Sequence, residues 1–118
     1  MTDTREGTRP PELPRQVAKG GATTLVLALL ADRPMYGYEL VQAIRERSDG
    51  LLSFGEGTVY PILYALRDKG YLRSEAQESK EGRRRRVYHV TPLGLEALAA
   101  YRSEWDRLTE GMRLALDG

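Results

Sequence analysis

The chain has 118 residues, of which 41% are hydrophobic and 30% are charged. This length suits one domain with room for a flexible arm, and the composition is that of a globular protein with a conventional core. The absence of cysteine excludes disulfides, thiolate metal sites and cysteine nucleophiles, and agrees with a reducing compartment. The longest apolar run spans 7 residues (25–31), against about 20 for a membrane span, and no secretory signal opens the chain. We therefore expect a cytoplasmic protein without a membrane partner.

The formal net charge is only +1, but the charge is unevenly distributed. Residues 79–89 contain five basic side chains and one acidic side chain, a local charge of +4. Only three of the 18 basic residues are lysines, and guanidinium groups suit bidentate contacts to phosphates and bases. A genome-wide codon bias towards arginine explains this preference equally well. The basic residues of the segment are Lys80, Arg83, Arg84, Arg85 and Arg86.

The first half of the chain predicts an arm and two helices. Residues 1–14 hold three prolines and Gly20-Gly21 resists helix formation, so we expect a flexible arm over residues 1–20. Residues 24–31 predict a helix that is buried on most of its circumference and ends before Pro34. Residues 35–47 predict an amphipathic helix that ends at the turn 48–50. Its apolar side is formed by Tyr36, Leu40, Val41 and Ile44.

A third helix is predicted over residues 59–69. Thr58 suits the N-cap, and this start makes Pro61 the third helical residue, where no intrahelical hydrogen bond is lost. Gly70 ends the helix. One face of it is apolar, with Val59, Ile62, Leu63 and Leu66, and the flank beside that face is aromatic and basic, with Tyr60, Tyr64 and Arg67.

A charged hairpin follows, with strands over residues 71–76 and Arg84–Val90 around a turn at residues 79–82. Alternation puts Arg84 and Arg86 on the face of Tyr88, near the root of the hairpin. The same alternation leaves Lys80, Arg83 and Arg85 freer to meet phosphates. The alternative interpretation is a charged edge that prevents sheets from associating.

Thr91 and Pro92 predict the N-cap and first residue of a last helix that continues nearly to Leu116, with Gly94 weakening its first turn. Apolar residues recur along it at spacings of three and four, which is typical of a helix seam. The seam either meets a partner chain or packs on the core of its own domain. Its residues are Leu98, Tyr101, Trp105, Leu108, Met112 and Ala115.

Three helices, a basic hairpin and a final helix form the order of a winged helix-turn-helix, a mainly α fold with a small β-hairpin. The third helix then faces the major groove of DNA with Tyr60, Tyr64 and Arg67, and the hairpin reaches the backbone or minor groove. The rival interpretation is a protein-interaction module in which these tyrosines contact protein and the arginines form a solvated rim. Phosphate neutralisation gives binding a steep salt dependence, which distinguishes the two.

Three segments resemble the PadR family of bacterial transcriptional regulators: YGYEL at residues 36–40, GTVYPILYALRDKGYL at 57–72 and GRRRRVYHVTPLGLEAL at 82–98. The resemblance spans about residues 22–117 and implies a winged-helix DNA-binding domain, here residues 21–91, followed by a dimerisation helix, here residues 92–118. It also implies a homodimeric repressor that a small molecule releases from a palindromic operator. The family's DNA-reading positions carry over to Thr58, Tyr60, Tyr64 and the turn from Lys80 to Arg86.

The last helix resembles the one in the family's small subgroup. In some of those relatives an aromatic ligand lies between the subunits beside a tryptophan, and Trp105 has the similar place. From its position in the seam, Trp105 suits either an anchor of the dimer interface or a wall of such a ligand site.

Enzymatic chemistry is not expected. The chain has one histidine and lacks the HExxH, GxSxG and P-loop patterns, so no catalytic residue or cofactor is predicted. His89 has no second histidine or cysteine nearby, which favours a structural imidazole over a metal ligand. Gly55-Glu56-Gly57 fails the dinucleotide-binding pattern, because residue 60 is tyrosine.

Overall fold

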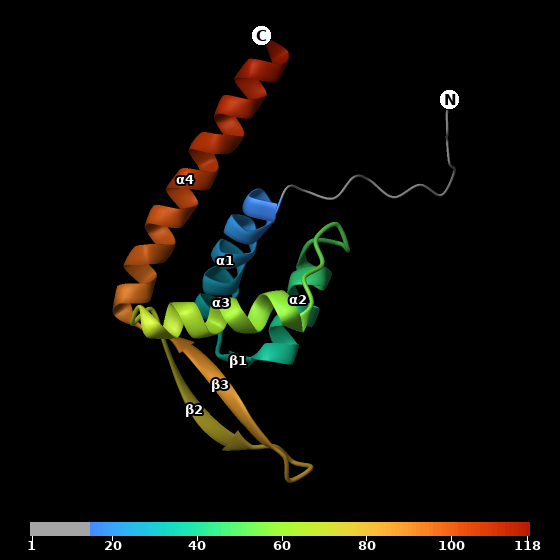
Figure 1. Cartoon of the computed structure of the whole chain (residues 1–118), viewed down its shortest axis with the longest axis vertical. Coiled ribbons are helices and arrows are strands. Elements are labelled where there is room, and N and C mark those ends of the chain that lie inside the picture. Colours follow the sequence, from blue (N-terminus) through green and yellow to red (C-terminus); the bar gives the residue numbers. More distant parts are fainter. Residues whose placement is uncertain (1–14) are drawn as a thin grey trace, which may run out of the picture.

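The computed structural model describes residues 15–118, which form four helices and a three-stranded antiparallel sheet of order β1-β3-β2. Helices α1, α2 and α3 pack together, the β2–β3 hairpin projects from one side of them, and α4 extends in the opposite direction (Figure 1). No helix within residues 15–118 is long and apolar enough to cross a membrane. The elements are α1 (Arg15–Asp32), β1 (Met35–Tyr36), α2 (Gly37–Arg47), α3 (Glu56–Asp68), β2 (Leu72–Glu78), β3 (Arg84–Val90) and α4 (Pro92–Asp117).

Helix α1 runs through Gly20 and Gly21, so the expectation that this pair resists helix formation is wrong. The indole of Trp105, from α4, lies against α1 at Gly21, where a Cβ would stand 3.2 Å from its Cζ2 atom. Such packing offsets the helix cost of a glycine, about 1 kcal/mol. The remainder of the expected arm, residues 1–14, lies outside the described residues.

The predicted helix over residues 35–47 begins two residues late, because Met35 and Tyr36 form the unexpected strand β1. Met35 pairs with Tyr88 of β3, and Tyr36 pairs with Val87. The backbone N–H of Tyr36 donates to Oε1 of Glu39 at 3.0 Å, which satisfies one free donor at the start of α2. Strand β1 therefore joins the helical part of the fold to the hairpin.

Helix α3 begins at Glu56 with Gly55 as its N-cap, so the prediction that Thr58 is the cap is wrong. The carbonyl of Gly55 accepts from the N–H groups of Thr58 and Val59, each at 3.0 Å. Glu56 adds a negative charge to the first turn, where the helix dipole favours it. Pro61 is consequently the sixth helical residue and not the third. The predicted apolar face is confirmed by the burial of Val59, Ile62, Leu63 and Leu66.

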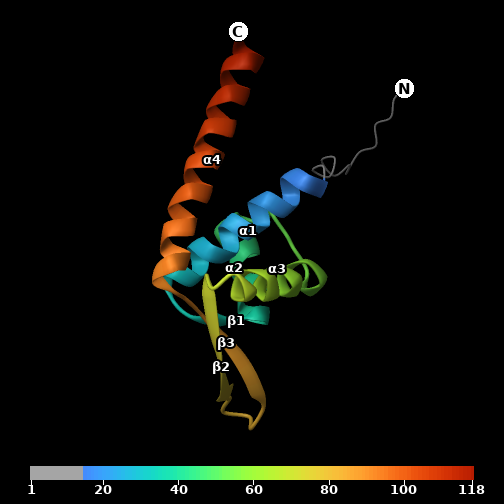
Figure 2. The ribbon, with the colours of Figure 1, turned by 60° about the vertical axis from the view of Figure 1, so that its left-hand side comes forward.

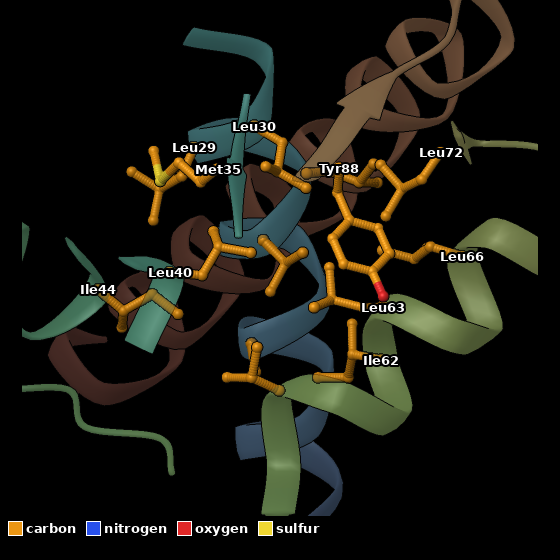
Figure 3. Close-up of a cluster of buried hydrophobic side chains, with 14 of the residues drawn as sticks. Leu29, Leu30, Met35, Leu40, Ile44, Ile62, Leu63, Leu66, Leu72 and Tyr88 are labelled. Atoms are coloured by element: carbon orange, nitrogen blue, oxygen red, sulfur yellow. The ribbon is translucent and has the colours of Figure 1, made fainter. Parts of the chain in front are cut away.

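The hairpin, called the wing from here on (residues 72–90), is attached at its root. All seven residues of β2 pair with β3, and the N–H of Ser79 donates to the carbonyl of Arg83 at 2.7 Å across the turn. Strand β2 begins one residue later and ends two residues later than expected. Near the root the buried ring of Tyr88 lies among leucines of α1, α3 and β2 (Figure 3). The tip of the wing extends beyond this core.

Helix α4 begins as predicted, with Thr91 as N-cap and Pro92 as first residue. Oγ1 of Thr91 accepts from the N–H of Gly94 at 3.0 Å and donates to the carbonyl of Gly70 at 2.7 Å. A Cβ on Gly94 would collide with the carbonyl oxygen of Tyr71, so this contact requires glycine. The base of α4 is thus fixed against the end of α3 and the root of the wing.

The seam of α4 divides into two parts. Leu98 is 9% exposed in the core, and Tyr101 packs against that core. Trp105 contacts α1, whereas Leu108 and Met112 are 47% and 52% exposed. Figure 2 shows this far part of α4 standing clear of the other elements. The first part of the seam therefore packs on its own chain, and the far part is uncovered.

Candidate nucleic-acid interface

A groove of about 570 Å³ separates α3 from the wing. We call it the α3–wing groove. Four tyrosines and four arginines line it, and no acidic side chain does. Helix α3 supplies one wall and β3 supplies most of the other. The lining residues are Tyr36, Tyr60, Tyr64, Arg67, Arg84, Arg85, Arg86 and Tyr88.

The α3 wall presents Tyr64 and Arg67. The ring of Tyr64 is 46% exposed, and the guanidinium carbon of Arg67 lies 5.3 Å from its centroid. Arg67 also approaches Asp68, with 3.5 Å between Nη2 and Oδ1. Because a guanidinium and an aromatic ring attract one another in this arrangement, the two side chains form one combined surface. The predicted aromatic and basic flank of α3 is confirmed at these residues.

Tyr60 lies deeper in the groove than Tyr64. Its ring is 6.1 Å from that of Tyr64, and it fills the space beside Gly37, where a Cβ would overlap the ring. Burial raises the pKa of Tyr60, and the carboxylate of Glu56 raises it further. Tyr60 therefore packs at the junction of α2 and α3, while Thr58 is exposed in the first turn of α3.

One face of β3 forms most of the other wall of the groove. It holds every second residue of the strand, as alternation predicts: Arg84, Arg86 and Tyr88. They pair with Glu78, Ala76 and Ser74 of β2. Arg86 donates from Nη1 to Oγ of Ser74 at 3.2 Å. Arg84 forms no side-chain hydrogen bond or ion pair with any residue of the described segment 15–118.

The hydroxyl of Tyr88 lies among side chains from both walls of the groove. Burial raises the pKa of Tyr88 and the neighbouring Tyr64 adds to this, while the cations of Arg67 and Arg86 oppose it. Side chains from both walls of the groove therefore influence the pKa of the same hydroxyl. With their pKa values raised, Tyr60 and Tyr88 are protonated at neutral pH and keep their hydrogen-bond donors.

The surroundings of Arg85 differ from the sequence prediction, in which this side chain is freer to meet phosphates. Its guanidinium carbon lies 4.3 Å from the ring centroid of Tyr36, and its Nη2 lies 3.8 Å from Oε1 of Glu81. The reason is β1, which brings Tyr36 alongside β3 on the side of Arg85. Lys80 and Arg83 are exposed at the tip of the wing, and their side chains have no hydrogen-bond or ion-pair partner among residues 15–118.

The face of the wing that holds Arg85, opposite to the face of Arg84 and Arg86, also carries an ionic cluster around Glu75. Arg73 donates to this carboxylate at 3.0 Å and Gln77 donates at 3.3 Å, and these hydrogen bonds lower the pKa of Glu75. Nε2 of His89 lies 3.8 Å from Glu75 and is buried without a hydrogen-bond partner. Residues 15–118 hold no group of three side chains suited to a metal ion. The imidazole of His89 therefore lies in the sheet beside one carboxylate and is not part of a set of metal ligands within residues 15–118.

The family of the chain follows from its sequence. The sequence profile of the "Transcriptional regulator PadR-like family" matches residues 26–100. The chain belongs to the PadR family. Because members of this family are transcriptional regulators and not enzymes, the chain is a PadR-family transcriptional regulator, and the predicted family and fold class are confirmed.

Individual transcriptional regulators are similar to this chain in sequence or in structure. The transcriptional regulator Rv3488 of Mycobacterium tuberculosis is 33% identical over 94 residues, which cover 80% of this chain and 84% of that protein. The structure of a transcriptional regulator from Clostridium thermocellum is 31% identical with a TM-score of 0.76, covering 83% of this chain and 95% of that one. A PadR-like transcriptional regulator from Bacillus cereus is 26% identical with a TM-score of 0.73, covering 87% and 98%.

Two lining residues of the α3–wing groove, Tyr36 and Tyr88, are missing from the predicted DNA contacts. Tyr88 can be found from the sequence, because alternation in a correctly predicted strand places it on the face of Arg84 and Arg86. Tyr36 cannot be found in this way, because the sequence predicts a helix there and the partner strand lies about fifty residues later. The predicted Tyr60, Tyr64, Arg67, Arg84 and Arg85 are all brought together in the groove of this PadR-family chain.

Proposed function

We propose that this PadR-family regulator is a homodimeric repressor that binds a palindromic operator in double-stranded DNA and releases it when a small aromatic effector binds. The α3–wing groove carries the proposal, since it holds four guanidinium groups and no carboxylate. A polyanion with regularly spaced phosphates neutralises such a surface, and phosphate contacts supply much of the affinity of DNA-binding proteins.

Helix α3 enters the major groove in this proposal. Thr58 and Tyr64 face the base edges, and Arg67 extends the same surface. On the wing, Arg84 and Arg86 face the DNA backbone from within the groove, and Lys80 and Arg83 reach it from the tip. Phosphate contacts fix the position of the protein on the duplex, and base contacts select the sequence.

The dimer is formed along the uncovered part of the α4 seam. Exposed Leu108 and Met112 support this arrangement, because apolar side chains at heptad spacing suit a second helix. Tyr101 and Trp105 border the interface, and Leu98 supports it from the core of its own chain. Two recognition helices must stand about 34 Å apart to enter successive major grooves, which one domain of this size does not span.

The effector site is beside Trp105. One side of its indole is against α1 at Gly21, and the remainder is partly exposed at the point where the covered part of the seam ends. In the dimer this surface is a wall for a flat aromatic compound. Because Trp105 is the only tryptophan, its fluorescence reports on this site alone. We expect planar aromatic compounds at micromolar concentration to quench this fluorescence. If none of the compounds quenches it, Trp105 has only a packing role.

The test of DNA binding compares DNA from upstream of the protein's own gene with random duplex of equal length. Fluorescence anisotropy is measured at several salt concentrations. We expect the upstream DNA to bind at least about 10³-fold more tightly, and binding to both DNAs to weaken steeply with salt. An affinity that does not change with salt concentration would overturn the proposal and favour a protein-interaction module instead.

A further inference from the structure

Three consecutive arginines of β3 have the same charge but different surroundings. Arg84 has no partner within residues 15–118, and Arg86 donates to Ser74 across the strand pair. Arg85 alone is stacked on an aromatic ring, 4.3 Å from the centroid of Tyr36, and its side chain is only 31% exposed. A planar guanidinium at this distance is held by attraction to the ring face.

The stacking occurs where the wing leaves the body of the protein. Pairing between β1 and β3 ends at Tyr36 and Val87, and Arg85 is the next residue of β3 on that face towards the tip. Tyr36 is itself fixed, because it immediately precedes α2 and its N–H is bonded to Glu39. The same guanidinium that stacks on Tyr36 also approaches the carboxylate of Glu81 in the turn of the wing. One side chain therefore connects the start of α2 with the tip of the wing.

We propose that Arg85 is a positioning residue, which by stacking on Tyr36 sets the orientation of the wing relative to α3 and so keeps Arg84 and Arg86 directed towards the DNA. This role needs a flat ring at residue 36 and a guanidinium at residue 85. It does not need Arg85 to touch a phosphate. The significance for DNA binding rests on the proposed function, but the effect on the wing exists in the free protein.

The first experiment measures hydrogen exchange in the free protein at the amides of residues 77–86. Removing the stacking contact with Arg85→Ala or Tyr36→Leu is expected to speed exchange there by about twofold to fivefold, the factor that corresponds to an exposed cation–π contact. Tyr36→Phe keeps the ring and should exchange like the wild type. Arg84→Ala is the matched control, because it removes the same charge from the neighbouring residue and should leave exchange unchanged.

The second experiment is a double-mutant cycle on DNA affinity. Tyr36→Leu changes no charge, yet it should weaken binding about as much as Arg85→Ala does. In the Tyr36→Leu background Arg85→Ala should have little further effect, and Arg84→Ala should lose part of its effect, because the wing no longer directs that guanidinium towards the DNA. A direct phosphate contact by Arg85 would instead keep its full effect in both backgrounds.

The outcomes separate this proposal from the proposed function. Unchanged exchange in both Arg85→Ala and Tyr36→Leu, with circular dichroism like the wild type, would overturn the positioning role whatever the DNA result. Faster exchange in both variants and not in Tyr36→Phe supports it even if the wild type binds no DNA, in which case only the proposed function fails. Independent, additive losses of affinity in the cycle would assign Arg85 to the phosphates and overturn the proposal.

Discussion

Two exposed surfaces of the protein contrast in shape and chemistry. The α3–wing groove is concave, lined by arginines and tyrosines, and built by elements that are far apart in the sequence. The far part of α4 is a single helix that stands clear of the fold, with exposed Leu108, Met112, Leu114 and Leu116. The first surface suits a polyanion and the second suits apolar contact with another helix. Their separation within one small chain suggests that binding DNA and binding a partner chain can be disturbed independently.

The largest expected effect comes from introducing charge into the far seam. Leu108→Asp combined with Met112→Asp places carboxylates where the second helix would pack, so light scattering should report a monomer. DNA affinity should fall by about 100-fold or more, because the second half-site loses the high effective concentration that linkage provides. Leu95→Asp is the control, since Leu95 is also 52% exposed on α4 but lies outside the seam. A dimeric double variant would contradict the proposed interface.

A smaller effect is expected from Tyr64→Ala on α3. Loss of a base contact should reduce affinity for specific DNA by about 1 to 3 kcal/mol and leave binding to random duplex nearly unchanged. Tyr38→Ala is a matched control, because Tyr38 is 48% exposed, close to the 46% of Tyr64, and does not line the groove. Thermal unfolding checks both variants. Equal losses on specific and random DNA would remove Tyr64 from sequence readout.

The smallest effect is expected from Arg84→Ala on the wing. Removing one phosphate contact should weaken specific and random binding by similar factors and reduce the slope of log K against log salt by about one unit. Arg102→Ala on α4 removes the same charge from an exposed position away from the groove and should leave the slope unchanged. A slope that Arg84→Ala does not alter would show that this arginine meets no phosphate.

The parts of the fold that were predictable from the sequence depend on local signals. The apolar face of α3 follows from a helical period within one segment, and the start of α4 follows from the adjacent cap and proline, Thr91 and Pro92. Strand β3 follows from alternation between two turns. Each of these signals lies within a few residues of the structure that it determines, so no tertiary contact was needed to find it.

The parts that were not predictable depend on distant contacts. Two residues cannot identify β1, since only pairing with Val87 and Tyr88 makes them a strand. The surroundings of Arg85 were missed for that reason, because alternation gave its face but not the ring of Tyr36 on that face. The packing of Trp105, from the other end of the chain, against α1 at Gly21 is likewise a contact that the local sequence does not reveal. In α4 the period revealed an apolar seam, but not that Leu98 is covered by its own core.

The fixed base of α4 has a mechanical consequence. Thr91 is hydrogen-bonded to the last residues before the wing, and Gly94 fits against the Tyr71 carbonyl with no space for a side chain, so no flexible joint separates α4 from α3. Its 26 residues make a lever about 39 Å long at 1.5 Å per residue. A tilt of about 5° at one end of such a lever moves the other end by roughly 3 Å. In a dimer joined along this helix, a small change in the crossing angle would therefore alter the spacing of the two reading helices by ångströms, and the regulator would lose its fit to a rigid duplex without any part of it unfolding.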